Sequence, residues 1–144
     1  MRSLSILLAA VMAAGVATQA SAAEYTVKML NKGSGGTMVY EPAFVKIAPG
    51  DTVRFVATDK SHNAETIPGM LPTGAAPFKG KMNQDVAVKF TKPGVYGVKC
   101  LPHYGLGMIA LVEVGKPGNL AQAKSAKHPP LAQKRFNAIW PSVK

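Results

Sequence analysis

Residues 98–108 read VKCLPHYGLGM and hold the only cysteine of the chain. Cys100 is followed by His103 after two residues and by Met108 after four more. Thiolate, imidazole and thioether are metal-ligand groups, and the soft sulfur donors favour copper(I). A second imidazole is available far upstream, at His62. Two histidines and one cysteine in a plane, with a weak axial methionine, form an electron-transfer copper site, so these four residues predict one copper ion.

Each of these residues has a plain alternative interpretation. His62 and His103 are compatible with solvated loop histidines, Met108 with a core residue, and Cys100 with an inert buried thiol. A structural zinc site normally takes four cysteines or histidines, and methionine is a poor zinc ligand. No acidic residue flanks the loop to act as a base beside a catalytic zinc. The joint spacing therefore favours copper, whereas His128, next to two prolines, is predicted to be an ordinary surface residue.

The segment 98–108 joins two predicted strands, 95–100 and 108–114, and its ligands follow or precede them directly. Proline and glycine interrupt residues 64–83, which we expect to form a long irregular connection with a short strand or a helical turn. Short strands separated by proline and glycine turns predict an all-β sandwich or barrel with antiparallel pairing. Alternating apolar residues predict its other strands over 24–30, 38–47, 52–57 and 86–90.

The last part of the chain has a helical pattern. Asn119 is placed to cap a short helix over 120–126, and two prolines then break it. A second helix is predicted over 131–139, where apolar residues recur at helical spacing. We expect Phe136 and Trp140 to anchor this helix to the sandwich. So short a tail cannot bury a core of its own, and it belongs to the same domain.

Residues 1–22 have the layout of a secretory signal peptide. Arg2 supplies a positive start, an apolar run covers 6–17, and Ala20-Ser21-Ala22 offers a cleavage site. Cleavage after Ala23 is the alternative. The apolar run is shorter than the ~20 residues that a membrane-spanning helix needs, which argues against an anchor. We therefore expect an exported protein without a membrane span.

The remaining residues, 23–144, fit one domain that includes the helical extension from about residue 116. A lone cysteine in an exported protein has no internal disulfide partner. Cys100 therefore needs another explanation in that oxidising environment, and a bound metal provides it.

The chain is strongly basic, with 17 Lys and Arg against 7 Asp and Glu. Removal of residues 1–22 takes away one arginine and no acidic residue, so the net charge falls only from +10 to +9. Such a surplus favours an acidic partner, an anionic surface or nucleic acid. Export and the absence of any Lys/Arg run longer than Lys134-Arg135 argue against nucleic acid. Solubility alone is the plain alternative.

Three stretches and the ligand spacing resemble a known family. Residues 29–33 (MLNKG), 59–63 (DKSHN) and 98–104 (VKCLPHY) are similar to the type-1 blue copper proteins, the cupredoxins. The two-helix tail resembles one branch of that family, so the similarity covers the whole chain after the signal peptide. It implies a Greek-key sandwich of about eight strands and a monomeric periplasmic shuttle. It also implies donation of electrons to enzymes such as copper or haem nitrite reductase.

The resemblance also implies a role for each ligand. Cys100 would form the short bond to copper and dominate the electronic coupling. His62 would be the buried imidazole, and His103 the exposed one through which electrons leave. Met108 would tune the reduction potential from the axial position. The backbone N–H of Asn63, or of a nearby residue, would hydrogen-bond the sulfur.

A docking surface is implied as well. Pro102 and Met38 would help to form an apolar patch around His103, which meets a transient acidic redox partner. A ring of lysines would surround this patch and steer that partner: Lys32, Lys60, Lys79, Lys81 and Lys99.

The leading function is that of a one-electron carrier, and two other functions are alternatives to it. A copper enzyme would need a second metal with its own histidines, but only His128 remains after His62 and His103. The chain is therefore predicted not to be an enzyme. The alternative is a periplasmic copper chaperone or storage protein, which would favour exposed methionine- or cysteine-rich ligands.

Overall fold

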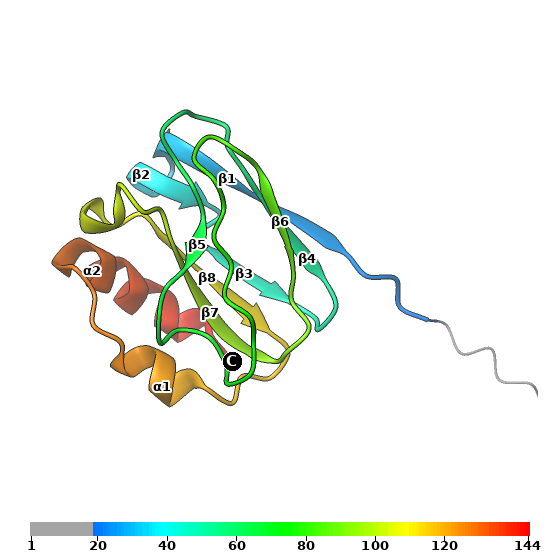
Figure 1. Cartoon of the computed structure of the whole chain (residues 1–144). Coiled ribbons are helices and arrows are strands. Elements are labelled where there is room, and N and C mark those ends of the chain that lie inside the picture. The colour runs from blue at the N-terminus through cyan, green and yellow to red at the C-terminus, as the bar shows by residue number, and fades with distance from the viewer. Residues whose placement is uncertain (1–18) are drawn as a thin grey trace, which may run out of the picture.

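The computed structural model describes residues 19–144, so most of the predicted signal peptide lies outside the described residues. Two four-stranded sheets face each other, and two helices follow them near the end of the chain (Figure 1). This arrangement confirms the predicted eight-stranded sandwich with two C-terminal helices. Within the described part of the chain, no helix has the length and apolarity needed to cross a membrane.

The first sheet has the strand order β2-β1-β4-β6. Strand β1 alternates between buried and exposed side chains, as in Val27 and Met29 against Thr26 and Lys28, because one face packs into the sandwich. It pairs antiparallel with β2 and parallel with β4. The four strands are β1 (Glu24–Gly33), β2 (Gly36–Glu41), β4 (Thr52–Val56) and β6 (Val86–Lys89).

The second sheet has the order β3-β8-β7-β5, with β3 parallel to β8. The parallel pairs in both sheets correct the expectation of purely antiparallel pairing. They arise because the chain crosses between the sheets, which places strands distant in sequence side by side. The four strands are β3 (Phe44–Ile47), β5 (Glu65–Thr66), β7 (Gly94–Lys99) and β8 (Ile109–Val114).

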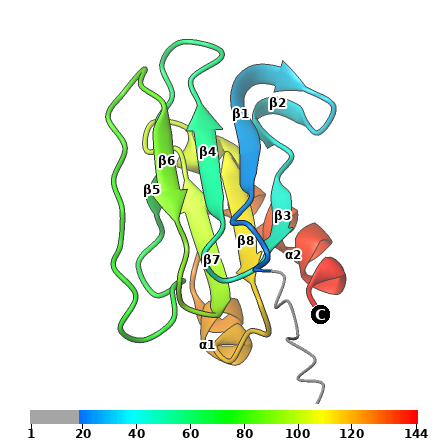
Figure 2. The ribbon, with the colours of Figure 1, turned by 90° about the vertical axis from the view of Figure 1, so that its right-hand side faces the viewer.

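Strand β8 is buried at all six positions, because both of its faces are covered. Ala110 and Val112 join the core between the sheets. Ile109 and Leu111 join a second core beneath the helices, where Phe136 is fully buried. Helix α2 (Pro130–Ile139) lies against β8, and α1 (Leu120–Ser125) against β7, outside the sandwich (Figure 2). The predicted anchoring role of Phe136 is thus confirmed.

Asn119 precedes α1, but the predicted helix cap is wrong, because its side chain makes no capping hydrogen bond. Its amide instead pairs with the backbone of Val95 in β7. The Val95 N–H donates to Asn119 Oδ1 at 2.8 Å, and Asn119 Nδ2 donates to the Val95 carbonyl at 2.9 Å. Strand β5 pairs with β7 only at Val98 and Lys99, so the asparagine satisfies backbone groups that β5 does not reach.

Two connections differ from the sequence-based expectation. The glycine-rich stretch 31–36 is mostly strand, because β1 and β2 form a hairpin closed by a tight turn in which Gly36 has a φ of 116°. Residues 64–83 contain the short strand β5 and no helix. His62 lies in the loop between β4 and β5, and residues 100–108 join β7 to β8. These loops carry the predicted ligands.

Candidate metal centre

The loop between β7 and β8 is closed by its own backbone hydrogen bonds. The Cys100 N–H donates to the Met108 carbonyl at 3.1 Å, and the Met108 N–H donates to the His103 carbonyl at 3.1 Å. A single 3-10 turn, η1 (Tyr104–Leu106), lies between them and ends at Gly107 with a φ of 85°. These bonds therefore hold the backbones of Cys100 and Met108 side by side and keep His103 close to Met108.

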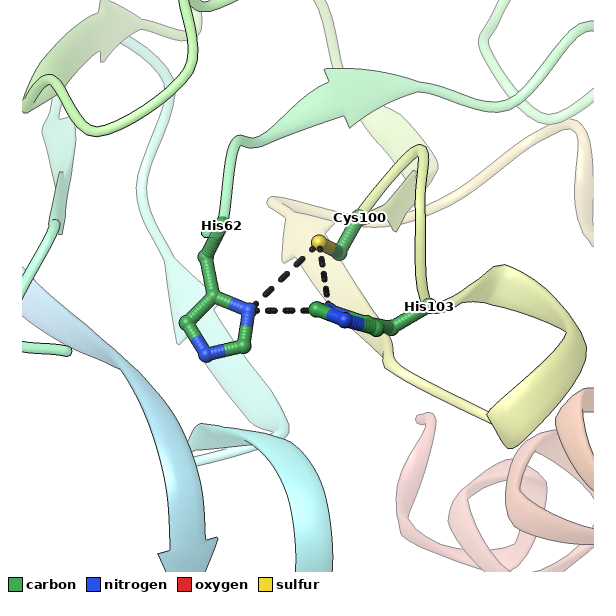
Figure 3. A group of neighbouring side chains, drawn as sticks. All are labelled: His62, Cys100 and His103. Atoms are coloured by element: carbon green, nitrogen blue, oxygen red, sulfur yellow. Dashed lines mark hydrogen bonds between the residues drawn. The ribbon is translucent and has the colours of Figure 1, made fainter. Parts of the chain in front are cut away.

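Three of the four predicted ligands converge directly. The Cys100 Sγ lies 3.7 Å from the Nδ1 of His62 and 3.6 Å from the Nδ1 of His103. The two Nδ1 atoms are 3.1 Å apart (Figure 3). His62 and Cys100 are fully buried, and His103 is partly exposed. Met108, at the end of the same loop, is fully buried, and its backbone is hydrogen-bonded to Cys100 and His103.

These separations fit one small metal ion. Donors that surround an ion at about 2.0–2.3 Å in a trigonal plane lie about 3.5–3.8 Å from one another. The two Sγ–Nδ1 distances fall in this range, the two Nδ1 atoms lie closer together at 3.1 Å, and all three donor atoms lie within 4.8 Å of one another. A thiolate with two imidazoles suits copper, whereas magnesium and calcium prefer sites made of oxygen ligands. The residues present therefore fit a copper ion.

Asn31 orients the buried imidazole. The Nε2 of His62 is 2.8 Å from the Oδ1 of Asn31, and a carbonyl oxygen can only accept a hydrogen bond. Nε2 therefore carries the proton, and Nδ1 keeps its lone pair directed at Cys100 and His103. Sequence reasoning missed this role, because Asn31 lies in a hairpin strand far from the ligands along the chain.

Without a cation, the buried pocket favours the neutral forms of His62 and Cys100. Burial lowers the pKa of His62, and the nearby His103 lowers it further. Burial raises the pKa of the Cys100 thiol, against the effect of hydrogen bonds from the backbone N–H groups of Asn63 and His103. A buried thiolate needs a compensating positive charge, which a coordinated metal ion supplies.

Asn63 ties the two ligand loops together. Its Oδ1 accepts a hydrogen bond from the Leu101 N–H at 2.8 Å, next to Cys100. Its Nδ2 donates to the Glu65 carboxylate at 3.0 Å and to the Gly80 carbonyl at 3.2 Å. Because Asn63 directly follows His62, these bonds fix the separation between the two buried ligands.

Comparison with known proteins identifies this arrangement. The family model for copper-binding proteins of the plastocyanin/azurin family matches residues 27–115. Pseudoazurin from Methylorubrum extorquens is 50% identical over 142 residues, with 96% of each chain covered. Pseudoazurin from Paracoccus pantotrophus is 50% identical over 135 residues, with 93% of each covered.

Solved structures of pseudoazurins have the same fold as this chain. The crystal structure of pseudoazurin from Methylobacterium extorquens AM1 superposes with a TM-score of 0.82 at 52% identity, covering 84% of this chain and 99% of that one. Pseudoazurin from Hyphomicrobium denitrificans gives 0.81 at 50% identity, covering 84% and 98%. The chain belongs to the pseudoazurins. It is accordingly a copper electron-transfer protein with one type-1 copper ion, in a family of electron carriers rather than enzymes.

The surface around the exposed ligand of this pseudoazurin site is apolar. Leu101 and Leu106 flank His103 and are 50% and 51% exposed. Pro102 between them is exposed, and Met38 is partly buried. Sequence reasoning named Pro102 and Met38 but missed both leucines, whose exposure depends on the path of the loop.

Lys99 does not join the predicted ring of steering lysines. Its ammonium lies 3.7 Å from the Glu65 carboxylate and 5.1 Å from the centre of the Tyr104 ring, and its side chain is only 18% exposed. Its charge is therefore engaged within the fold. The other predicted members are exposed: Lys32, Lys60, Lys79 and Lys81.

The interpretation of His128 as an ordinary surface residue is wrong. Its Nδ1 lies 2.6 Å from the Tyr104 hydroxyl, and its ring lies 4.6 Å from that of Phe136. Burial lowers the pKa of His128. It is not among the converging metal ligands, but it links the tail to the residue that follows His103. No local pattern signals this contact, because the two partners lie 24 residues apart.

Replacement of Asn31 by leucine removes the acceptor that orients His62. We expect the copper dissociation constant to rise about 10- to 100-fold, the usual cost of losing such a partner. Competition with a chelator of known affinity measures it. Asn31→Asp keeps an oxygen acceptor and should stay close to the wild type. Equal losses in both variants would contradict the proposed orienting role.

Proposed function

We propose that this chain is a periplasmic one-electron carrier whose copper is held by His62, Cys100, His103 and Met108. Convergence of the two Nδ1 atoms and the Sγ supports the equatorial set. Met108 would supply the fourth, thioether ligand, since it is buried and its backbone is hydrogen-bonded to both Cys100 and His103. A bound copper ion supplies the Cu(I)/Cu(II) couple.

The observation that carries this proposal is the set of hydrogen bonds that holds the donor residues in place. Asn31 and Asn63 fix the buried ligands, and the loop hydrogen bonds fix Met108 relative to Cys100. Donors held in one geometry disfavour rearrangement when the charge of the metal changes. A chaperone or storage protein would instead need ligands that exchange readily. His62 and Cys100 are fully buried, which favours the carrier.

The exposed edge of the site supports a role in docking. Electrons would leave through His103, and the apolar surface of Leu101 and Leu106 allows close approach of a partner without strong polar desolvation. Lys60 precedes His62 by two residues, and Lys32 follows Asn31, so positive charge lies beside this edge. The partner is a transient acidic redox protein such as a nitrite reductase, and the carrier acts as a monomer that does not bind nucleic acid.

The start of the fold supports export and cleavage after Ala22, leaving the domain 23–144. Residues 19–22 are exposed and leave the sandwich as an extended segment (Figure 1). Ala23 is held on both sides: its N–H donates to Asp51 Oδ1 at 2.8 Å, and its carbonyl accepts from the Thr52 N–H at 2.9 Å. Cleavage after Ala22 would place the new α-ammonium group against the carboxylate of Asp51.

The visible spectrum with one equivalent of copper(II) tests the carrier function. We expect an intense thiolate-to-copper band that disappears on reduction and is absent in Cys100→Ser. Met108→Leu should keep the band with altered relative intensities, because the axial donor is lost. Copper should also resist a chelator for hours. A colourless protein that releases copper quickly would favour trafficking instead.

Charge reversal at Lys60 tests the docking surface. Lys60→Glu should slow electron transfer to an acidic redox protein by roughly two- to fivefold at low salt, because it weakens electrostatic steering. The difference should shrink at high ionic strength. Lys116→Glu, beyond the opposite end of β8, is the matched control. Stopped-flow rates that fall equally in both variants would exclude a localised docking surface.

Processing is tested by the mass of the exported protein, which should begin at Ala23.

The Asp51 carboxylate should raise the pKa of the new α-amino group above its usual value of about 7.7–8.0. The stabilisation is then complete below that range and is lost as the pH rises through the raised pKa. Denaturation should show Asp51→Asn costing more stability at about pH 6 than at about pH 10. A protein that begins at Glu24 would contradict the assignment.

A further inference from the structure

Arg135 in α2 makes three hydrogen bonds to the backbone of two distant segments. Its Nη1 donates to the Met38 and Gly107 carbonyls, both at 2.7 Å. Its Nη2 donates to the Thr37 carbonyl at 2.9 Å. Among residues 19–144, no salt bridge includes Arg135, so its charge is directed at backbone carbonyls alone.

Among the described residues, β1 is the only strand that pairs with β2, so the other edge of β2 is free of strand partners there. Apolar packing does not close the gap between β2 and α2. A pocket of about 190 Å³ remains there, lined among others by Val39 and Ile139. Arg135 also lines this pocket, and its Nη2 donates to the Thr37 carbonyl at the edge of β2. The guanidinium therefore connects α2 to β2 at a place where side-chain packing does not.

At Gly107 the guanidinium reaches the metal loop. Gly107 directly precedes Met108 and has a φ of 85°. A Cβ at this position would lie 3.2 Å from both the backbone carbonyl carbon of Leu131 and the Cδ of Arg135. The loop thus passes directly over α2, and Arg135 holds the last carbonyl before Met108.

At Met38 the guanidinium contacts the β1–β2 hairpin, which carries Asn31, the residue that orients His62. The β1–β2 register pairs Leu30 with Val39 and Lys32 with Thr37, so Asn31 lies across from Met38. Asn31 in turn accepts the hydrogen bond from His62. Met38 has a positive φ of 50°, a conformation that nearby contacts must maintain in a residue with a side chain.

We infer that Arg135 is a positioning residue of the copper site, which fixes the hairpin that supports His62 relative to the loop that carries Met108. The inference rests on the proposed assignment of Met108 as a ligand. Lysine cannot reproduce this contact, because an ammonium group lacks the planar fork that reaches several carbonyls at once. The guanidinium keeps its charge when partly buried and so opposes an increase of positive charge at the metal.

Three variants separate the geometry from the charge. R135M removes both, R135K keeps the charge without the fork, and K134M removes a charge from an exposed neighbour on the same helix. The copper(II) visible and electron paramagnetic resonance spectra, the reduction potential and the rate of copper release to a chelator are measured for each. The denaturation midpoint of the metal-free protein reports folding separately.

In R135M we expect altered spectra, a lower reduction potential and about tenfold faster copper release, because the hydrogen bond to the Gly107 carbonyl, next to Met108, is lost together with the two to β2. R135K should share the spectral change and the faster release but keep more of the potential, whereas K134M should match the wild type. Wild-type spectra and release rates in R135M and R135K would overturn the inference, even with a lower denaturation midpoint, because Arg135 would then only fasten α2. A wild-type protein without the intense band would overturn the proposed function itself.

Discussion

The pairing of β7 with β8 is the constraint on which the centre depends. Its register runs from Gly94 opposite Val114 to Lys99 opposite Ile109, and Cys100 and Met108 are the next pair along the same ladder. A shift by one residue would turn every side chain of β8 to the other face. Both faces of β8 are buried, in two different cores, so such a shift is costly. Hydrophobic packing thus sets the relative placement of a thiol and a thioether.

The part of the site that is local in sequence could be predicted. The spacing of Cys100, His103 and Met108 lies within one loop between two recognisable strands, and it limits the chemistry before any fold is known. Supports that depend on distant packing could not be predicted. Asn31 orients His62 only because the β1–β2 hairpin lies over it, and Lys99 is neutralised only because β5 brings Glu65 beside it.

The same limit applies to the fold. Residue patterns predicted most of the strands and both helices, since alternation and helical spacing are local properties. They did not predict the parallel pairs, which follow from the crossing of the chain between sheets. Asn119 shows how tertiary contacts override a local preference. Its side chain, which suits a helix cap, instead hydrogen-bonds the backbone of Val95, because β5 does not extend far enough to pair with that part of β7.

The helical tail and the metal loop form a continuous structure. Phe136 fills the core beneath β8, and its ring lies against His128, whose Nδ1 meets the hydroxyl of Tyr104. One residue earlier in the same helix, Arg135 donates a hydrogen bond to the carbonyl of Gly107. Tyr104 follows His103, and Gly107 precedes Met108, so the tail contacts the loop next to two of its ligands. A tail too short to fold alone therefore gains its order from the sandwich and, in return, limits how far the ligand loop can move.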